Sequence, residues 1–159
     1  MLKKNDIWKS FLCGASVGCL FWNPVFSVSA QSNANGDTSY MSAYGYSYTA
    51  YNTVYTGKYS NDGQKYASAY LTNESAQSNL PGGYAGVYPI LYDDDDNVLA
   101  SPSDWYYSSS NYPGITRGVF YYNIIGQMPV MAKGLARIWN GSSYWTYATF
   151  ATPFLNDYT

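Results

Sequence analysis

Histidine is absent from this 159-residue chain, and its two cysteines, Cys13 and Cys19, both precede residue 20. Without histidine, Ser-His-Asp and Cys-His catalytic arrangements and histidine-built zinc sites are excluded. After residue 30 the only glutamate is Glu74, so a glycosidase pair of carboxylates would need an aspartate such as Asp104. No disulfide can form among residues 31–159. These absences favour a non-enzymatic protein whose fold depends on packing and hydrogen bonds.

Charge is scarce as well. Residues 31–159 carry five basic and nine acidic side chains, a net charge of −4, and the basic residues form no cluster along the sequence. Proteins that bind nucleic acid or anionic lipid present a basic patch to these ligands. Neither ligand is therefore an expected partner of this chain.

The first thirty residues have the order of an export signal. Three lysines within the first nine residues precede an apolar stretch, Phe11 to Val28, which ends in the small residues Val28-Ser29-Ala30. This order is typical of a secretory signal peptide, here cleaved after Ala30. It predicts a secreted mature chain, residues 31–159, without a membrane span. Export without disulfides fits a Gram-positive source.

Two alternatives for this segment remain. An apolar stretch of this length can just cross a bilayer as an uncleaved anchor, although Gly14, Gly18, Asn23 and Pro24 weaken a stable helix. A lipoprotein would carry its lipid on Cys13 or Cys19. The residue three positions before each cysteine is serine, where a lipidation motif has an aliphatic side chain. Cleavage after Ala30 is the favoured interpretation.

All twenty tyrosines fall after residue 30. A tyrosine ring is large and apolar while its hydroxyl tolerates water, which suits both half-buried strands and contact surfaces. Residues 31–38 are small and polar and predict a flexible leader, whereas from Ser39 onward residues alternate with the period of a strand. In the first run we expect one side to carry Tyr40, Tyr44, Tyr46 and Tyr48, and the other Met41 and Ala43.

Turn residues divide residues 39–159 into about eight or nine short strands, and no segment has a helical apolar period with caps. Asn61-Asp62-Gly63 is one strong turn, and Asn140-Gly141 predicts a two-residue hairpin between strands over 130–139 and 144–152. Residues 73–83 read as a polar loop. Pro89 predicts an edge position or a bulge, since proline cannot donate to a ladder. The pattern predicts one all-β domain over 39–159, an antiparallel β-sandwich or a small barrel.

Alternation along 130–139 gives a specific expectation for Trp139. Ala132, Ala136 and Ile138 share one side of this strand, and the other side carries Lys133, Leu135, Arg137 and Trp139. The basic residues must reach solvent, because lysine and arginine are almost never fully buried without a partner. We therefore expect the alanine and isoleucine side in the core, and Trp139 at the surface beside the cations.

The only charge cluster is the acidic run over residues 93–97. Asp93, Asp95 and Asn97 have the alternate spacing with which calcium-binding loops begin. The glycine and the later bidentate glutamate of an EF-hand are missing, so an EF-hand is excluded. A calcium ion held by a β-turn and a solvated acidic turn without a cofactor both remain open.

Aromatic side chains supply the other candidate site. Trp105, Tyr107, Trp139 and Trp145 are the candidate ligand-binding residues, because exposed rings can stack on the apolar faces of sugars. The alternative is that these rings fill the core of the domain. If the four rings instead form an exposed platform, the expected ligand is a glycan.

Three stretches resemble a group of small, mostly uncharacterised exported proteins of Bacillus and related Gram-positive bacteria: Gly82-Gly83-Tyr84-Ala85-Gly86, Ser103-Asp104-Trp105-Tyr106-Tyr107 and Ile138-Trp139-Asn140-Gly141-Ser142-Ser143-Tyr144. The stretch from Tyr44 to Ala69 is faintly similar to lactococcin 972-type bacteriocins, which are exported, cysteine-free and built from strands. This chain differs from them in length and in lacking histidine, and no functional residue carries over from either group.

Taken together, these features favour an exported non-enzymatic bacterial protein that acts at a cell envelope or surface. Its partner would be an envelope component or a glycan. Such a protein would be bacteriocin-like or a surface-interaction factor. A carbohydrate-binding module that uses exposed Trp and Tyr rings is the alternative.

Overall fold

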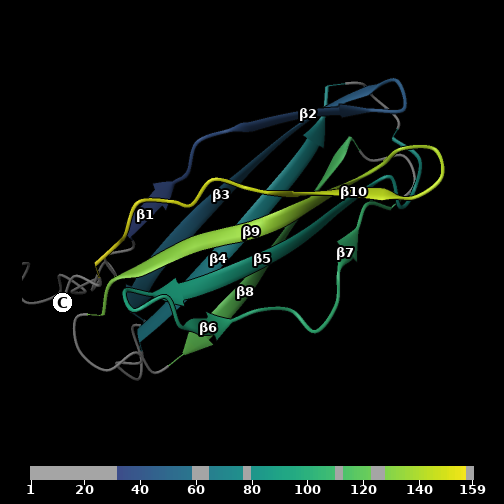
Figure 1. Cartoon of the computed structure of the whole chain (residues 1–159). Helices are drawn as coiled ribbons and strands as arrows, with labels where there is room; N and C mark the ends of the chain where they lie inside the picture. The colour runs from purple at the N-terminus through teal and green to yellow at the C-terminus, as the bar shows by residue number, and fades with distance from the viewer. Residues whose placement is uncertain (1–31, 59–64, 77–79, 110–112, 123–127, 157–159) are drawn as a thin grey trace, which may run out of the picture.

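The computed structural model describes residues 32–58, 65–76, 80–109, 113–122 and 128–156. These residues form ten strands and no helix (Figure 1). The strands are β1 (Ser32–Asn35), β2 (Ser39–Ala43), β3 (Tyr46–Lys58), β4 (Lys65–Ser75), β5 (Ala85–Asp93), β6 (Val98–Ala100), β7 (Tyr106–Tyr107), β8 (Gly114–Tyr122), β9 (Val130–Trp139) and β10 (Tyr144–Ala148).

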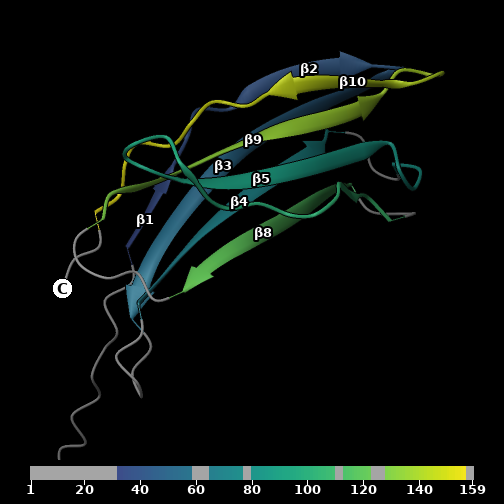
Figure 2. The ribbon, with the colours of Figure 1, turned by 60° about the horizontal axis from the view of Figure 1, so that its bottom comes forward.

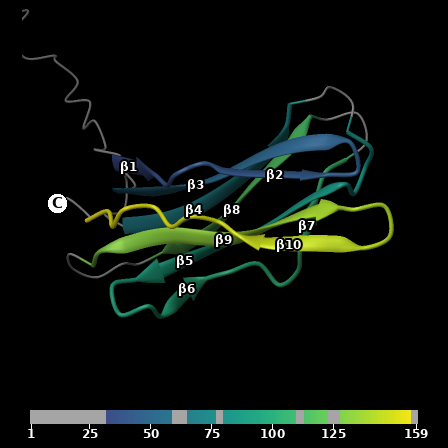
Figure 3. The ribbon, with the colours of Figure 1, turned by 45° about the horizontal axis from the view of Figure 1, so that its top comes forward.

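The strands make two antiparallel sheets of five strands each. Sheet A has the order β1-β3-β4-β8, with β2 also paired to β3, and sheet B has the order β10-β9-β5-β6, with β7 also paired to β5. Figure 3 separates the two layers, with β1, β2 and β3 towards the top and β5, β6 and β10 towards the bottom. The fold is the predicted all-β architecture, in the form of an open sandwich. In the part of the chain that the structure describes, no helix is long and apolar enough to span a membrane.

The inner faces of the two sheets carry small apolar side chains at every second position. On β4, Ala67, Ala69 and Leu71 are fully buried and alternate with Tyr66, Ser68 and Tyr70, as the sequence predicts. The facing strand β9 contributes Ala132, Ala136 and Ile138, which are also fully buried. Burial of these side chains between the sheets supplies the main drive for folding, because residues 31–159 contain no cysteine that could form a disulfide.

Residues 32–35 correct the expectation of a flexible leader. They form β1, which pairs with residues 53–56 of β3. β1 and β2 lie one after the other along the same side of β3, with a break at Gly36, whose backbone amide donates to the Asn52 carbonyl at 2.9 Å. Small polar residues carry no periodic signal. Their order comes from backbone hydrogen bonds to the edge of a long neighbouring strand.

The expectation that Tyr40, Tyr44, Tyr46 and Tyr48 share one side of a single strand is wrong, because a tight turn at Tyr44-Gly45 interrupts that strand. Both residues have positive φ, 52° and 80°, and the register pairs Ala43 with Tyr46. Such a two-residue turn matches the twist of a hairpin. It reverses the chain, so Tyr48 lies opposite Met41 and is only 1% exposed, whereas Tyr40 is 82% exposed.

The hairpin of β3 and β4 is confirmed as a pair of long strands, with Lys58 opposite Lys65. Its predicted turn, Asn61-Asp62-Gly63, lies outside the described residues. β4 continues to Ser75, so residues 73–75 belong to a strand and the loop predicted to begin at residue 73 begins later. Pairing on both sides, with β3 and with β8, holds these polar residues extended.

Pro89 occupies a local edge, in agreement with its sequence. One side of β5 pairs with β9, where Pro89 lies opposite Gly134. The other side pairs with β7 at Gly86 and Val87 and with β6 at Leu91 and Tyr92, and Pro89 lies between these two short pairings. The register also shifts between Leu91 and Tyr92. The missing N–H of proline therefore interrupts no ladder on that side.

The turn between β9 and β10 is longer than predicted. Trp139 pairs with Tyr144, so residues 140–143 form the loop. The Asn140 side-chain oxygen accepts hydrogen bonds from the backbone amides of Ser142 and Ser143, at 3.1 and 2.9 Å. The ring of Tyr44 lies against Gly141, where an added Cβ would meet it at 2.7 Å. The two-residue turn prediction is therefore wrong, because the register leaves four residues in the loop. A local sequence pattern does not include the contact between this loop and the β2–β3 turn.

Candidate functional site

The two sides of β9 are divided as predicted. Lys133 is exposed, Leu135, Arg137 and Trp139 are partly exposed, and the residues between them are buried. Trp139 is therefore neither hidden in the core nor fully exposed. Its ring packs against Tyr144, with 5.2 Å between ring centroids, and against Tyr84, at 6.2 Å.

Trp139 belongs to a group of side chains on the outer face of sheet B. We call this group the aromatic platform, and it comprises Trp105, Tyr107, Arg137, Trp139 and Tyr144. The register places Tyr107 across from Gly86 and Gly86 across from Arg137, so β7, β5 and β9 present one common face. Gly86 leaves room for the neighbouring ring, because an added Cβ would meet Tyr107 at 3.1 Å. The tertiary structure thus joins three of the four predicted ligand-binding residues.

Arg137 connects the rings of the platform. Its guanidinium carbon lies 3.8 Å from the ring centroid of Trp105, Nη1 donates to the Tyr107 hydroxyl at 2.8 Å, and Nε donates to Thr146 Oγ1 at 3.3 Å. The planar guanidinium can stack and donate at the same time, which an ammonium cannot do. Arg137 and Trp139 share the outer side of β9 as predicted, and the ring that stacks on the guanidinium is that of Trp105.

Tyr144 anchors the other end of the platform. Its hydroxyl donates to the Gly83 carbonyl at 2.8 Å, and its ring centroid lies 5.3 Å from that of Tyr107. Burial raises the pKa of the Tyr144 phenol, the nearby Tyr107 raises it further, and Arg137 opposes the change. The phenol therefore stays neutral at physiological pH and keeps its hydrogen bond.

Trp145 lies apart from the platform. It pairs with Ile138, whose side chain is in the core, so Trp145 projects from the inner side of sheet B. Because β10 is the border strand of the sheet, this indole is nevertheless 50% exposed. Period-two alternation predicts only that Trp145 and Tyr144 lie on opposite sides of the strand. The pairing with β9 decides which of these two side chains points outward.

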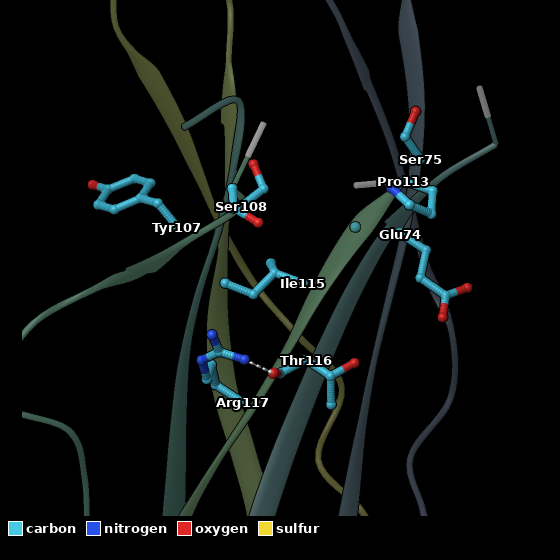
Figure 4. A pocket seen from close by; sticks show the side chains of 10 residues that line it. Glu74, Ser75, Tyr107, Ser108, Pro113, Ile115, Thr116 and Arg117 are labelled. Carbon is cyan, nitrogen blue, oxygen red and sulfur yellow. Dashed lines mark hydrogen bonds between the residues drawn. The ribbon is translucent and has the colours of Figure 1, made fainter. Parts of the chain in front are cut away.

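A hollow of about 720 Å³ adjoins the platform at Tyr107 (Figure 4). Arg117 and Tyr107 lie on one side of the start of β8, and Glu74 lies on the other. Arg117 lies over the ring of Tyr106, 5.9 Å from the centroid, and donates to the Thr116 carbonyl at 2.9 Å. The wall also includes Ser108, which accepts from the Ala85 amide at 3.2 Å. Glu74, Arg117 and Ser108 thus line one cavity beside exposed rings, with the carboxylate and the guanidinium on opposite sides of β8.

Sequence patterns did not indicate this hollow. Glu74 was expected in a loop, but it lies in β4, opposite Gly114 of β8. Arg117 and the β7 tyrosines belong to different sheets, and only the fold brings the Arg117 guanidinium to 5.9 Å from the Tyr106 ring centroid. Only the packing of the two sheets brings these groups together.

The acidic turn is closed by its own hydrogen bonds. Asp93 Oδ1 accepts from the backbone amides of Asp95 and Asn97, at 3.0 and 2.8 Å, and Asp93 Oδ2 accepts from Asn97 Nδ2 at 3.0 Å. The hydrogen bond from the Asn97 side chain is the main reason why the pKa of Asp93 is lowered. Among the described residues, no three histidine, cysteine, aspartate or glutamate side chains form a group that could hold a metal ion. The arrangement suits a solvated turn, and calcium binding stays a prediction.

No protein-family model matches this chain, and a search of curated proteins finds no match. The functional interpretation therefore depends on the residues and their geometry.

Proposed function

We propose that this chain is an exported, non-enzymatic binding protein that attaches to a bacterial cell surface through a glycan of the envelope. The aromatic platform is its contact site, and the hollow beside Tyr107 receives polar groups of the same ligand. The chemistry of the site is recognition, since histidine and cysteine nucleophile systems are absent from residues 31–159.

The observation that carries this proposal is the fixed arrangement of Trp105, Tyr107 and Tyr144 around Arg137. Rings held in place by hydrogen bonds and stacking lose little conformational freedom when a ligand binds. Their faces suit the C–H surfaces of a sugar, and the donors of Arg137 and Arg117 suit its oxygens. The acidic and basic groups around the hollow favour a glycan that carries charged as well as hydroxyl substituents.

Replacement of Trp105 by alanine tests the platform. We expect binding of the protein to isolated Gram-positive cell walls, measured by co-sedimentation, to weaken about tenfold, because the stacked face is lost while the backbone of β7 is kept. Trp145→Ala is the matched control, since it removes an indole of the same size from outside the platform. Circular dichroism establishes that both variants are folded.

Equal losses in the two variants would contradict this location of the site, and unchanged binding in both would contradict the platform altogether. The bacteriocin-like form of the proposal adds a further expectation. If the protein kills rather than attaches, wild-type protein inhibits growth of related Gram-positive bacteria, and Trp105→Ala reduces this inhibition together with wall binding. Wall binding without inhibition identifies a surface-interaction factor.

Export is tested by expression of the full chain in a secreting Gram-positive host. We expect the protein in the medium, with Gln31 as its first residue in mass spectrometry, because the small residues before that position suit signal peptidase. Cleavage there leaves a single residue before β1. A cell-bound chain that retains residues 1–30, or a lipid attached to Cys13 or Cys19, contradicts the prediction.

A further inference from the structure

The outer face of sheet A is a second aromatic surface, separate from the platform. We call it the tyrosine face. Its register alternates rings with small residues: Tyr70 of β4 lies across from Gly118 of β8, and Tyr66 lies across from Gly57 of β3. An added Cβ would meet the Tyr70 ring at 2.5 Å on Gly118, and the Tyr66 ring at 2.8 Å on Gly57. The glycines therefore let the rings lie flat over the neighbouring strands.

The rings form a continuous band across three strands. Tyr55 and Tyr70 meet edge to face with centroids 5.5 Å apart, and Tyr70 meets Phe120 in the same way at 5.8 Å. Phe120 and Tyr122 are nearly parallel, with an interplanar angle of 12°, and are 45% and 47% exposed. Tyr55 and Tyr70 are partly exposed, so the band offers ring faces and ring edges to a ligand.

This band borders a hollow of about 530 Å³, which is within the roughly 300–1,000 Å³ typical of ligand sites. The floor consists of Thr53, Ser68 and Thr72, each less than a tenth exposed. Thr53 donates to Asn35 Oδ1 at 2.8 Å, and the Thr72 and Thr116 hydroxyls share a hydrogen bond of 2.9 Å. Hydroxyl groups and rings thus line the same hollow.

No lysine, arginine, aspartate or glutamate is among the residues that line this hollow in the described part of the chain. Burial, followed by the nearby Tyr55, Tyr66 and Tyr122, raises the pKa of Tyr70, so this phenol too is neutral at physiological pH. The hollow beside Tyr107 differs, because it contains Glu74 and Arg117. The two surfaces therefore suit ligands of different charge.

We infer that the tyrosine face binds a neutral polysaccharide chain. The C–H faces of neutral sugars suit the rings of Tyr70 and Phe120, and their hydroxyls suit phenol and threonine hydroxyls, whereas a charged glycan finds no partner there. The tyrosine face and the platform are the outer faces of opposite sheets, with the core between them (Figure 2). The two hollows share only Thr116 among the described residues that line them, so the rings of each face can hold a polymer of their own.

The experiment is isothermal titration of the protein with four neutral hexasaccharides, cellohexaose, xylohexaose, mannohexaose and maltohexaose, and with hexagalacturonate as the charged counterpart. We expect at least one neutral oligosaccharide to bind, with an affinity that does not change between low and high salt. Phe120→Ala and Tyr70→Ala are expected to weaken this binding at least tenfold. Phe120 is the more exposed ring, so its variant keeps the test valid if Tyr70→Ala fails to fold.

Tyr40→Ala and Trp105→Ala are the controls, and we expect neither to change the binding of the neutral oligosaccharide. Unchanged binding in Trp105→Ala, whatever happens to wall binding, separates this inference from the proposed function. Binding of none of the four neutral oligosaccharides, or tighter binding of hexagalacturonate, overturns it. So does a concentration-dependent dimer in analytical ultracentrifugation that Phe120→Asp dissociates, because a second copy would then cover the face.

Discussion

Replacement of Asn52 by alanine is expected to lower the free energy of unfolding by about 3 kcal/mol. Asn52 lies on the inner side of β3 and is fully buried. Its Nδ2 donates to Thr149 Oγ1 and to the Phe150 carbonyl, both at 2.7 Å, and Thr149 Oγ1 donates in turn to the Gly134 carbonyl at 2.9 Å. This chain of hydrogen bonds connects the two sheets. Alanine removes both bonds and leaves the buried Thr149 hydroxyl and the partly buried Phe150 carbonyl without this donor.

Chemical denaturation measures this loss, and Asn73→Ala is the matched control. Asn73 is also fully buried and also reaches the other sheet, but by a single, longer bond of 3.3 Å to the Arg137 carbonyl. We expect Asn73→Ala to lower the free energy of unfolding by about 1–2 kcal/mol. A double-mutant cycle of Asn52→Ala with Thr149→Val should show a coupling of about 1 kcal/mol, since the two residues share a bond. A greater loss in Asn73→Ala than in Asn52→Ala would contradict this account of the inter-sheet connection.

The wild-type protein is expected to lose about 3 kcal/mol of unfolding free energy between pH 10 and pH 12 through Tyr48, and Tyr48→Phe is expected to abolish this loss. The reason is that burial raises the pKa of Tyr48 to about 12 from its usual value near 10. Tyr46 and Tyr84 add to the rise. Below pH 10 the phenol is neutral in both the folded and the unfolded chain. Between pH 10 and 12 only the unfolded chain loses the proton, so the folded state becomes less stable as the pH rises.

The measurement is urea denaturation of wild type and Tyr48→Phe at pH 7, 10 and 11. At pH 11 about half of the difference, about 1.4 kcal/mol, should already be present. At pH 7 we expect Tyr48→Phe to be at least as stable as wild type, since the Tyr48 hydroxyl is buried without a hydrogen-bond partner among the described residues. Tyr40→Phe is the control, because the ring of Tyr40 is 82% exposed. Parallel pH profiles for wild type and Tyr48→Phe would show that this phenol ionises in the folded protein as it does in the unfolded chain.

Asn52 and Tyr48 both show which structural features a sequence pattern does not predict. Period-two alternation predicts that Tyr51 and Tyr55 share a face, and it therefore also places Asn52 on the other face. It does not show that this face is the core, or that a segment beyond β10 supplies the partners of Asn52. For Tyr48, the alternation was right within each strand. The prediction failed because the turn at Tyr44-Gly45 separates two strands that the pattern had joined.

The sequence by itself determined the all-β class, the antiparallel sheets, the long β3–β4 hairpin and the division of β9 into a core side and an outer side. These features follow from side-chain period and turn residues, which act between neighbours along the chain. The tertiary structure alone decided that Ser32–Asn35 forms β1, that residues 140–143 make a longer loop, and that Trp105 joins Arg137 while Trp145 lies elsewhere. Each of these depends on which strands pair and on contacts between residues far apart in the sequence. Such contacts form only when the sheets bury their common faces.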